Sequence, residues 1–175
     1  FVNTNVIGSA VMLDAALSYW QALPEKRRNS FRYIHVSTDE VYGCLGKTGS
    51  FTETTPYSPS SPYSASKAGA DHLTLAWHRT FGLPVIISIC SNNYGPYQHA
   101  EKFIPTVIRA ALSSDTIPVY GTGENVRDWV YVEDHVSGLL RLQKAGVTGQ
   151  RYNFGGQAEH TYLCVATNSC TILDE

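Results

Sequence analysis

The chain has 175 residues, a length typical of one ordinary domain. Its 43% hydrophobic and 16% charged residues indicate a packed globular protein and exclude a disordered one. The net charge is −2, and its 13 basic and 15 acidic residues are mixed, so no basic block indicates nucleic acid or an anionic membrane as a partner. The sequence contains no signal-peptide pattern and no apolar run near the roughly 20 residues that span a bilayer.

Cysteine and histidine spacing gives no sign of a metal site. The four cysteines form neither a C-x-x-C pair nor a zinc spacing, and the six histidines do not cluster. We therefore expect no metal, reduced thiols and a cytoplasmic protein. Both ends of the chain have helical periodicity without a start or a stop signal, so we also expect an internal piece of a longer protein.

Hydrophobic periodicity and turn residues predict alternating helices and strands. In chain order we expect a helix over 1–22, a strand over 31–37, a loop over 44–62, a helix over 62–81, a strand over 85–90, a loop over 91–96, a helix over 103–112, a strand over 117–120, an extended segment over 129–131, a helix over 133–144, a strand over 152–156 and a helix from 161. For the helix over 62–81, Ser61 is the expected N-cap, Pro62 the first residue and Gly82 the end. The alternation favours an α/β fold with a mostly parallel sheet, in which ligands bind beyond the carboxyl ends of the strands.

The helix over 62–81 opens with Tyr63 and Lys67, four residues apart. That spacing places both side chains on one face, one turn apart. A neighbouring ammonium stabilises a phenolate, so we expect Lys67 to lower the pKa of Tyr63 from its usual value of about 10. Tyr63 could then take a proton from an alcohol near neutral pH. A solvated helix face that carries a tyrosine and a lysine by chance is the alternative.

Polar residues also follow two of the predicted strands. Thr38, Asp39 and Glu40 come after the strand over 31–37, and Asn92 and Asn93 come after the next one. Two carboxylates in different environments can act as an acid and a base, and a threonine hydroxyl can bind a substrate oxygen. A solvated turn is the alternative for the acids, and the asparagines could either bind a ligand or close a turn.

Two basic residues are further candidates for substrate contacts. Arg127 could bind a phosphate with its planar guanidinium or could pair with Asp128. Lys102 is a similar candidate, with an ordinary surface lysine as the alternative.

Five motifs of the chain occur together, in order and at a recognisable spacing. They are Ser37 to Gly43, the pair Tyr63 and Lys67, Ser91 to Tyr97 with Glu101 and Lys102, Arg127 to Asp134, and Tyr152 to Gly156. In these motifs the chain resembles the dTDP-glucose 4,6-dehydratases of the extended short-chain dehydrogenase/reductase superfamily, closely over residues 1–156 and loosely in the tail. The tyrosine and lysine mark the superfamily, whereas the Thr-Asp-Glu triplet is specific to dehydratases, because other members need no acid and base to eliminate water.

The resemblance implies a Rossmann-like doubly wound parallel sheet that is partial here, without the N-terminal phosphate-loop unit and the C-terminal substrate part. Residues 1–121 would form the central and C-terminal part of the NAD-binding domain. Residues 122–175 would form a mixed region that leads into the sugar-nucleotide-binding part. The family is typically dimeric, so the resemblance also implies a homodimer through the helices near 1–22 and 63–81, with no nucleic-acid or membrane partner.

The reaction that the resemblance implies converts dTDP-glucose to dTDP-4-keto-6-deoxyglucose with NAD as a transiently reduced cofactor. Tyr63, assisted by Lys67, would take the proton of the sugar 4-hydroxyl while hydride leaves C4. Glu40 would then remove the C5 proton and Asp39 would protonate the departing 6-hydroxyl. Hydride would return to C6, and Thr38 would bind the O4 region of the sugar.

The same resemblance implies two sets of binding residues. Cofactor contacts would come from Thr4, Tyr63, Lys67 and Asn93. Nucleotide-sugar contacts would come from Thr38, Asn92, Lys102, Phe103, Pro118, Val119, Tyr120 and Arg127. The tail departs from the family, because Tyr162 stands where the family usually places an asparagine that contacts the nucleotide.

Two other interpretations remain open at this point. Another NAD-dependent nucleotide-sugar epimerase or decarboxylase of the same fold would keep Tyr63 and Lys67 and would not need Asp39 and Glu40. A non-catalytic fragment that only dimerises through its amphipathic helices would need none of them. The residues also leave UDP and CDP open as alternatives to dTDP.

Overall fold

The computed structural model describes residues 1–45, 48–119 and 121–173. Contacts divide the chain into two compact units. The first unit comprises Phe1–Cys90 and Ser137–Phe154, and the second comprises Ser91–Val136 and the chain from Gly155 onward. The sequence-based division into 1–121 and 122–175 stays a prediction.

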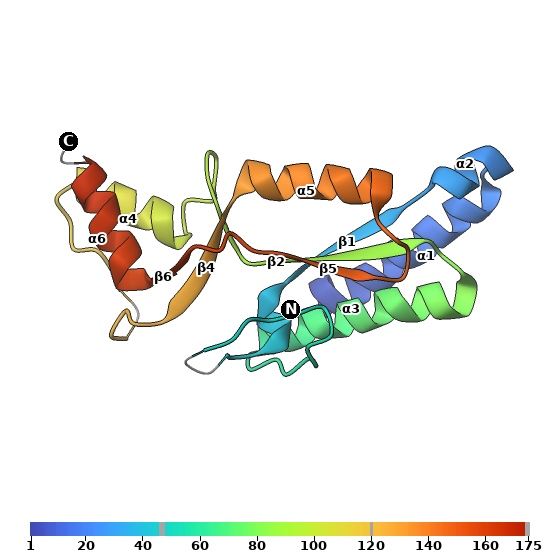
Figure 1. Cartoon of the computed structure of the whole chain (residues 1–175), viewed down its shortest axis with the longest axis horizontal. Helices are drawn as coiled ribbons and strands as arrows, with labels where there is room; N and C mark the ends of the chain where they lie inside the picture. Colours follow the sequence, from blue (N-terminus) through green and yellow to red (C-terminus); the bar gives the residue numbers. More distant parts are fainter. Residues whose placement is uncertain (46–47, 120, 174–175) are drawn as a thin grey trace. The chain divides into compact units, whose positions relative to one another are not determined.

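The first unit is a three-stranded parallel sheet with helices on both faces (Figure 1). Its elements are the π-helix η1 (Val2–Ile7), α1 (Gly8–Ala22), α2 (Glu25–Ser30), β1 (Tyr33–Thr38), the 3-10 helix η2 (Asp39–Tyr42), α3 (Pro62–Phe81), β2 (Val85–Cys90), the C-terminal part of α5 (Val132–Ala145) and β5 (Arg151–Phe154). The strand order is β1-β2-β5, and Cys90 of β2 is in register with both Thr38 of β1 and Phe154 of β5. All three strands therefore end at the same edge, where ligands of parallel sheets bind.

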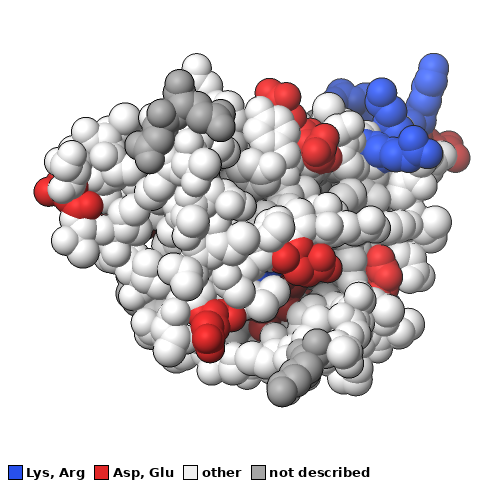
Figure 2. Space-filling view, turned by 60° about the vertical axis from the view of Figure 1, so that its left-hand side comes forward, with Lys and Arg blue, Asp and Glu red and all other residues white. Residues whose placement is uncertain are grey.

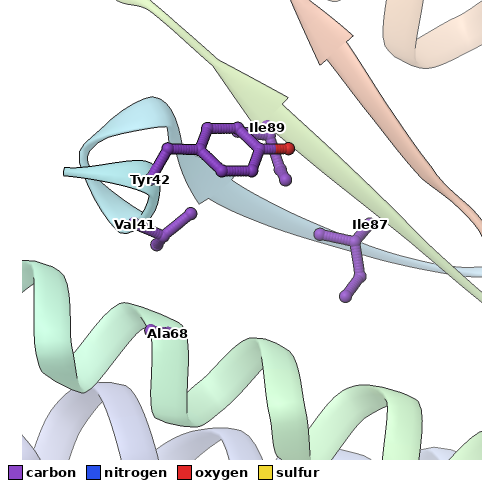
Figure 3. Packing of buried hydrophobic residues seen from close by; sticks show 5 residues of the cluster. All are labelled: Val41, Tyr42, Ala68, Ile87 and Ile89. Carbon is purple, nitrogen blue, oxygen red and sulfur yellow. The ribbon is translucent and has the colours of Figure 1, made fainter. Parts of the chain in front are cut away.

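The central strand β2 forms the core of this unit. Every one of its six residues is buried, as the continuous β-branched run predicted for a strand covered on both faces. Ile87 and Ile89 pack with Ala68 of α3 and with Val41 and Tyr42 of η2 (Figure 3). The turn that follows β1 is thus anchored in the same core as the strand beside it.

Helix α3 covers residues Pro62–Phe81, as predicted. Ser61 and Ser64 form a reciprocal capping box, Pro62 occupies the first turn, and Gly82 ends the helix with a left-handed φ of 74°. Small residues keep the helix thin, so η1 packs closely on it, and Asn5 Nδ2 donates to Ser66 Oγ over 2.9 Å.

The second unit has a separate three-stranded sheet. Its elements are β3 (Asn92–Tyr94), α4 (Phe103–Leu112), β4 (Val126–Tyr131), the start of α5, β6 (Glu159–Thr161) and α6 (Tyr162–Leu173). The strand order is β3-β4-β6, with β3 and β4 parallel and β4 and β6 antiparallel. Helices α4 and α6 pack together and bury Val107, Ala110 and Ala166.

Several elements differ from the sequence predictions, among them β3, which forms within the expected loop over 91–96. The expected helix over 1–22 begins with the π-helical turns of η1, and the polar segment after Pro24 is helical, with Glu25 at its start and two arginines at its end that suit the helix dipole. Residues 117–119 form no strand, and Tyr120 lies outside the described residues. The short antiparallel strand β6 and the division into two sheets were not predicted.

No described helix is both long and apolar enough to cross a bilayer. On the face in Figure 2, Lys and Arg side chains gather at one corner while Asp and Glu side chains are scattered.

We predict that Gly43→Ala destabilises the native protein by about 3 kcal/mol, because Gly43 has φ 90° and an added Cβ would collide with the carbonyl oxygen of Ser58. Gly49→Ala is the matched control: its φ is 109°, but the nearest atom to an added Cβ is Leu45 Cδ2 at 4.0 Å, so only about 1–2 kcal/mol of backbone strain is expected. Denaturant unfolding measures both changes, and equal losses would contradict the collision.

Candidate active site

The Thr-Asp-Glu triplet lies at the carboxyl end of β1. Thr38 is the last strand residue and caps η2: its Oγ1 accepts from the Glu40 amide and donates to Asp39 Oδ1, both over 3.4 Å. The next two residues of η2, Val41 and Tyr42, point into the core and are 0% and 2% exposed. With the second half of the turn held inside, Glu40 is exposed and Asp39 is half-buried at the edge of the sheet.

The buried side chain of Tyr42 attaches this turn to strand β5. Tyr42 OH donates to Asn153 Oδ1 of β5 over 2.8 Å, and its ring stacks on Phe51 with the centroids 5.0 Å apart. Burial raises the pKa of Tyr42 to about 12, so its hydroxyl remains a donor at any working pH. The two acids are therefore presented by a turn that is tied to a second strand.

Tyr63 and Lys67 lie in the first turns of α3, beside the same edge. Tyr63 is half-buried, and the ring of Phe1 meets its ring edge-on at 5.7 Å between centroids. Lys67 Nζ donates to the carbonyl oxygen of Val36 in β1 over 2.7 Å. The lysine thus ties the helix to the strand that carries the triplet.

The predicted lowering of the Tyr63 pKa is wrong for this structure. Burial raises the pKa of Tyr63, and the charges of Glu40, Cys90 and Asp39 raise it further, in that order. The Lys67 ammonium is directed at the Val36 carbonyl. The five predicted catalytic residues, Thr38, Asp39, Glu40, Tyr63 and Lys67, all lie in the first unit.

A buried carboxylate behind this edge was missed by the sequence reasoning. Asp71 of α3 is 0% exposed, and its Oδ2 accepts from Ser37 Oγ over 2.7 Å and from Tyr57 OH over 2.8 Å. Its Oδ1 lies 3.1 Å from His35 Nε2, although the alignment of the two atoms falls short of a hydrogen bond. The available signal was its spacing: Asp71 follows Tyr63 and Lys67 at the same four-residue interval.

The predicted nucleotide-sugar contacts other than Thr38 belong to the second unit or lie outside the described residues. Asn92 and Asn93 are half-buried in β3, and Asn93 Oδ1 lies 3.0 Å from His135 Nδ1. Burial lowers the pKa of His135, so this imidazole is held neutral. Lys102 is exposed at the start of α4, and of the segment 118–120, Pro118 is exposed, Val119 is half-buried and Tyr120 is not described.

Tyr162 is the centre of an aromatic group in the second unit. Its ring meets Phe103 edge-on at 4.6 Å and Trp129 at 5.9 Å. The guanidinium of Arg127 lies over the same ring, 5.9 Å from its centroid. The residue that departs from the family pattern therefore contacts two of the predicted substrate residues, Phe103 and Arg127.

Two side chains of the first unit have the chemistry to bind a ribose of NAD. The half-buried Tyr63 and Lys67 offer a phenol and an ammonium at the edge where the strands end, and such groups can bind ribose hydroxyls. Thr4 is exposed in η1, which packs on α3. Among the described residues, no strand passes through a glycine-rich turn into a helix, the arrangement that binds a pyrophosphate.

Comparisons with known sequences support the predicted resemblance. A family model described as GDP-mannose 4,6 dehydratase matches residues 1–174. The chain is 54% identical to a dTDP-glucose 4,6-dehydratase of Xanthomonas campestris pv. campestris, with 100% of this chain and 50% of the relative covered. It is 50% identical to dTDP-glucose 4,6-dehydratase 1 of Escherichia coli K12, with 100% and 51% covered. The chain thus spans about half the length of the curated relatives it matches.

Solved structures agree with this result. The dTDP-glucose 4,6-dehydratase from Bacillus anthracis in complex with NAD has a TM-score of 0.91 and 47% identity, covering 100% of this chain and 53% of that chain. The Streptomyces venezuelae enzyme with NAD and TYD bound has a TM-score of 0.90 and 43% identity, covering 99% and 51%. A UDP-glucuronic acid 4-epimerase from Bacillus cereus, in complex with UDP-glucuronic acid and NAD, has a TM-score of 0.87 but only 25% identity, covering 100% and 53%.

These matches confirm the predicted Rossmann-like α/β class. They also confirm the resemblance to the dTDP-glucose 4,6-dehydratases. Since the family model extends over residues 1–174, the chain belongs to the GDP-mannose 4,6 dehydratase family.

Proposed function

We propose that the protein carrying this chain is an NAD-dependent dTDP-glucose 4,6-dehydratase. The observation that supports this most is the meeting of two chemistries at one sheet edge. The acid pair Asp39 and Glu40 follows β1, and Lys67, one turn after Tyr63, donates to the Val36 carbonyl of the same strand. The charges of both acids raise the pKa of Tyr63. The relatives that share this chain over its whole length at 50–54% identity carry the same activity in their names.

In this proposal Tyr63 takes the proton of the sugar 4-hydroxyl. The bound NAD would supply the hydride acceptor for C4 and the hydride donor for C6. Hydride can leave C4 only as the 4-hydroxyl loses its proton, so a base must lie next to the 4-oxygen. The charges of Glu40 and Asp39 disfavour the phenolate of Tyr63, and the Lys67 ammonium, one helical turn away, would offset them.

The triplet performs the elimination. A ketone at C4 acidifies the C5 hydrogen, which Glu40 would remove as a proton with its exposed carboxylate and return to C5 when hydride reaches C6. Asp39 is half-buried and accepts a hydrogen bond from Thr38 Oγ1. In its protonated form it would protonate the departing 6-hydroxyl, so that water is lost. Different exposure of the two carboxyls suits different roles, one as base and one as acid. Thr38 would also bind the O4 region of the sugar.

The second unit would bind the rest of the nucleotide sugar. Arg127 and Lys102 would bind the diphosphate, and Phe103 and Asn92 would border the nucleotide. Asn93, held beside His135, would contact the cofactor together with Thr4, Tyr63 and Lys67. Pro118, Val119 and Tyr120 complete the proposed substrate contacts.

An epimerase or a decarboxylase of the same fold is the less favoured function, because neither chemistry needs the two acids. Incubation of the native protein with NAD and dTDP-glucose, followed by mass spectrometry and NMR of the sugar, separates the possibilities. A 4-keto-6-deoxy sugar is expected, whereas a galactose epimer would overturn the dehydratase. Turnover of UDP-glucose or CDP-glucose in place of dTDP-glucose would reassign the nucleotide. Absence of both NAD binding and turnover would leave the non-catalytic dimerising role.

We also infer that the protein is a cytoplasmic homodimer. The outward face of η1 and α1 is apolar, with Val2, Ile7, Val11 and Met12 between 53% and 62% exposed. A second copy of the same helices, together with α3, would cover it in a four-helix interface. No nucleic acid or membrane partner is proposed.

Tyr63→Phe is expected to lower kcat for dTDP-glucose by roughly 10²–10⁴-fold, because it removes the proposed base of the first proton transfer. Formation of reduced cofactor and of the 4-keto-6-deoxy product should fall together, since oxidation precedes elimination. Steady-state kinetics with Tyr19→Phe as the control, an exposed tyrosine on α1, should show no comparable loss. Retained turnover in Tyr63→Phe would remove this residue from the mechanism.

Asp39→Asn is expected to slow elimination by roughly 10²–10⁴-fold and to spare oxidation at C4, because only the acid for the 6-hydroxyl is lost. Reduced cofactor should then accumulate, which its near-ultraviolet absorbance reports in a stopped-flow measurement. Asp115→Asn, at an exposed site after α4, is the control. The proposed acid would be wrong if Asp39→Asn turned over normally.

Met12→Glu is expected to shift the protein from dimer toward monomer, because it places a charge in the exposed apolar face of α1. Sedimentation velocity measures the shift, with Gln21→Glu on the same helix as the control. A wild-type monomer, or an equal effect of both substitutions, speaks against this interface.

A further inference from the structure

Asp71 has the environment of a residue that holds other groups in place. Its carboxylate is 0% exposed, and a buried charge is retained only where several partners stabilise it. Two hydroxyls, from Ser37 and Tyr57, converge on its Oδ2, and the His35 ring faces its Oδ1. The three partners come from two separate segments of chain, so this one side chain connects α3 to both.

One of those segments is the end of β1 itself. Ser37 directly precedes Thr38, and its Oγ donates to Asp71 over 2.7 Å. One residue earlier, the Val36 carbonyl accepts from Lys67. Adjacent residues of the strand are therefore bound by adjacent turns of the helix, and the triplet begins immediately after this double attachment.

The other segment is the loop between η2 and α3. Tyr57 packs edge-on against Tyr42 at 5.5 Å and lies under the Arg151 guanidinium at 4.9 Å. Burial, followed by the charge of Asp71, raises the pKa of Tyr57, so its hydroxyl remains protonated and can donate. Through Tyr57, Asp71 also supports the ring that anchors η2.

We propose that Asp71 is a positioning residue that holds the turn carrying Asp39 and Glu40 at a set distance from Tyr63. This rests on the proposed dehydratase function. Tyr63, Lys67 and Asp71 share one face of α3, so the helix bears both the base for oxidation and the attachment for the elimination acids. Loosening that attachment misplaces the acids and spares the base, since Tyr63 is held by its own helix.

The test compares Ser37→Ala with Thr74→Val in the native protein. Both remove one buried hydroxyl, but Thr74 donates to Ala70 within α3 and makes no contact with β1 through that hydroxyl. Ser37→Ala should slow elimination relative to C4 oxidation by roughly 10–100-fold, the effect of a small misplacement of reacting groups. Reduced cofactor should accumulate in Ser37→Ala and not in Thr74→Val.

A second measurement needs no cofactor or substrate. Hydrogen–deuterium exchange at the amides of residues 39–42 should quicken in Ser37→Ala and stay unchanged in Thr74→Val. Asp71→Asn retains an oxygen that can accept both hydroxyls, so it should stay closer to wild type than Asp71→Ala in both measurements.

The outcomes separate this proposal from the function on which it rests. Equal product partition and equal amide exchange in Ser37→Ala and Thr74→Val would overturn the positioning role. A wild-type protein that forms no 4-keto-6-deoxy sugar would overturn the dehydratase, while amide exchange would still decide whether Asp71 holds the turn. Failure of Asp71→Ala to fold leaves the Ser37→Ala comparison decisive.

Discussion

The attachment of α3 to the end of β1 determines where every proposed catalytic group of the first unit lies. Apolar packing of Ala68 against Val41, Ile87 and Ile89 brings the helix to the sheet, but such packing is not directional. The orientation of the helix is set by two hydrogen bonds, from Lys67 to the Val36 carbonyl and from the Ser37 hydroxyl to Asp71. Hydrogen bonds to charged groups in a buried setting are stronger and more demanding in geometry than neutral ones at a surface. The helix therefore has one favoured position along the strand.

That position places a phenol beside two carboxylates. Its consequence is electrostatic: the pKa of Tyr63 is raised, first by burial and then by its acidic neighbours. A phenol in such a site stays protonated until positive charge approaches it. In the proposed chemistry the oxidised nicotinamide would bring that charge, so proton removal from the sugar would depend on the presence of the cofactor. The same acids that disfavour the phenolate would, in the proposed function, carry out the following elimination.

Local signals in the sequence predicted the parts of the fold that depend on local chemistry. Ser61, Pro62 and Gly82 gave the bounds of α3, because capping and helix termination involve neighbouring residues. The apolar run of β2 gave a strand buried on both faces. Contacts between distant segments were not accessible in this way. The partner of Lys67 lies 31 residues away and that of Asp71 lies 34 residues away, so neither periodicity nor spacing reveals them. Short β6, with three residues, carries too little pattern to be recognised.

The buried carboxylate of Asp71 also bears on how the first unit acquires its structure. Its charge can leave water at low cost only when the hydroxyls of Ser37 and Tyr57 are both in place. Docking of the helix, completion of the strand and ordering of the intervening loop are thus coupled in one cooperative event. A nascent chain in which these hydrogen bonds to Asp71 have not yet formed would expose all three segments together, as a single target for a protease or a chaperone.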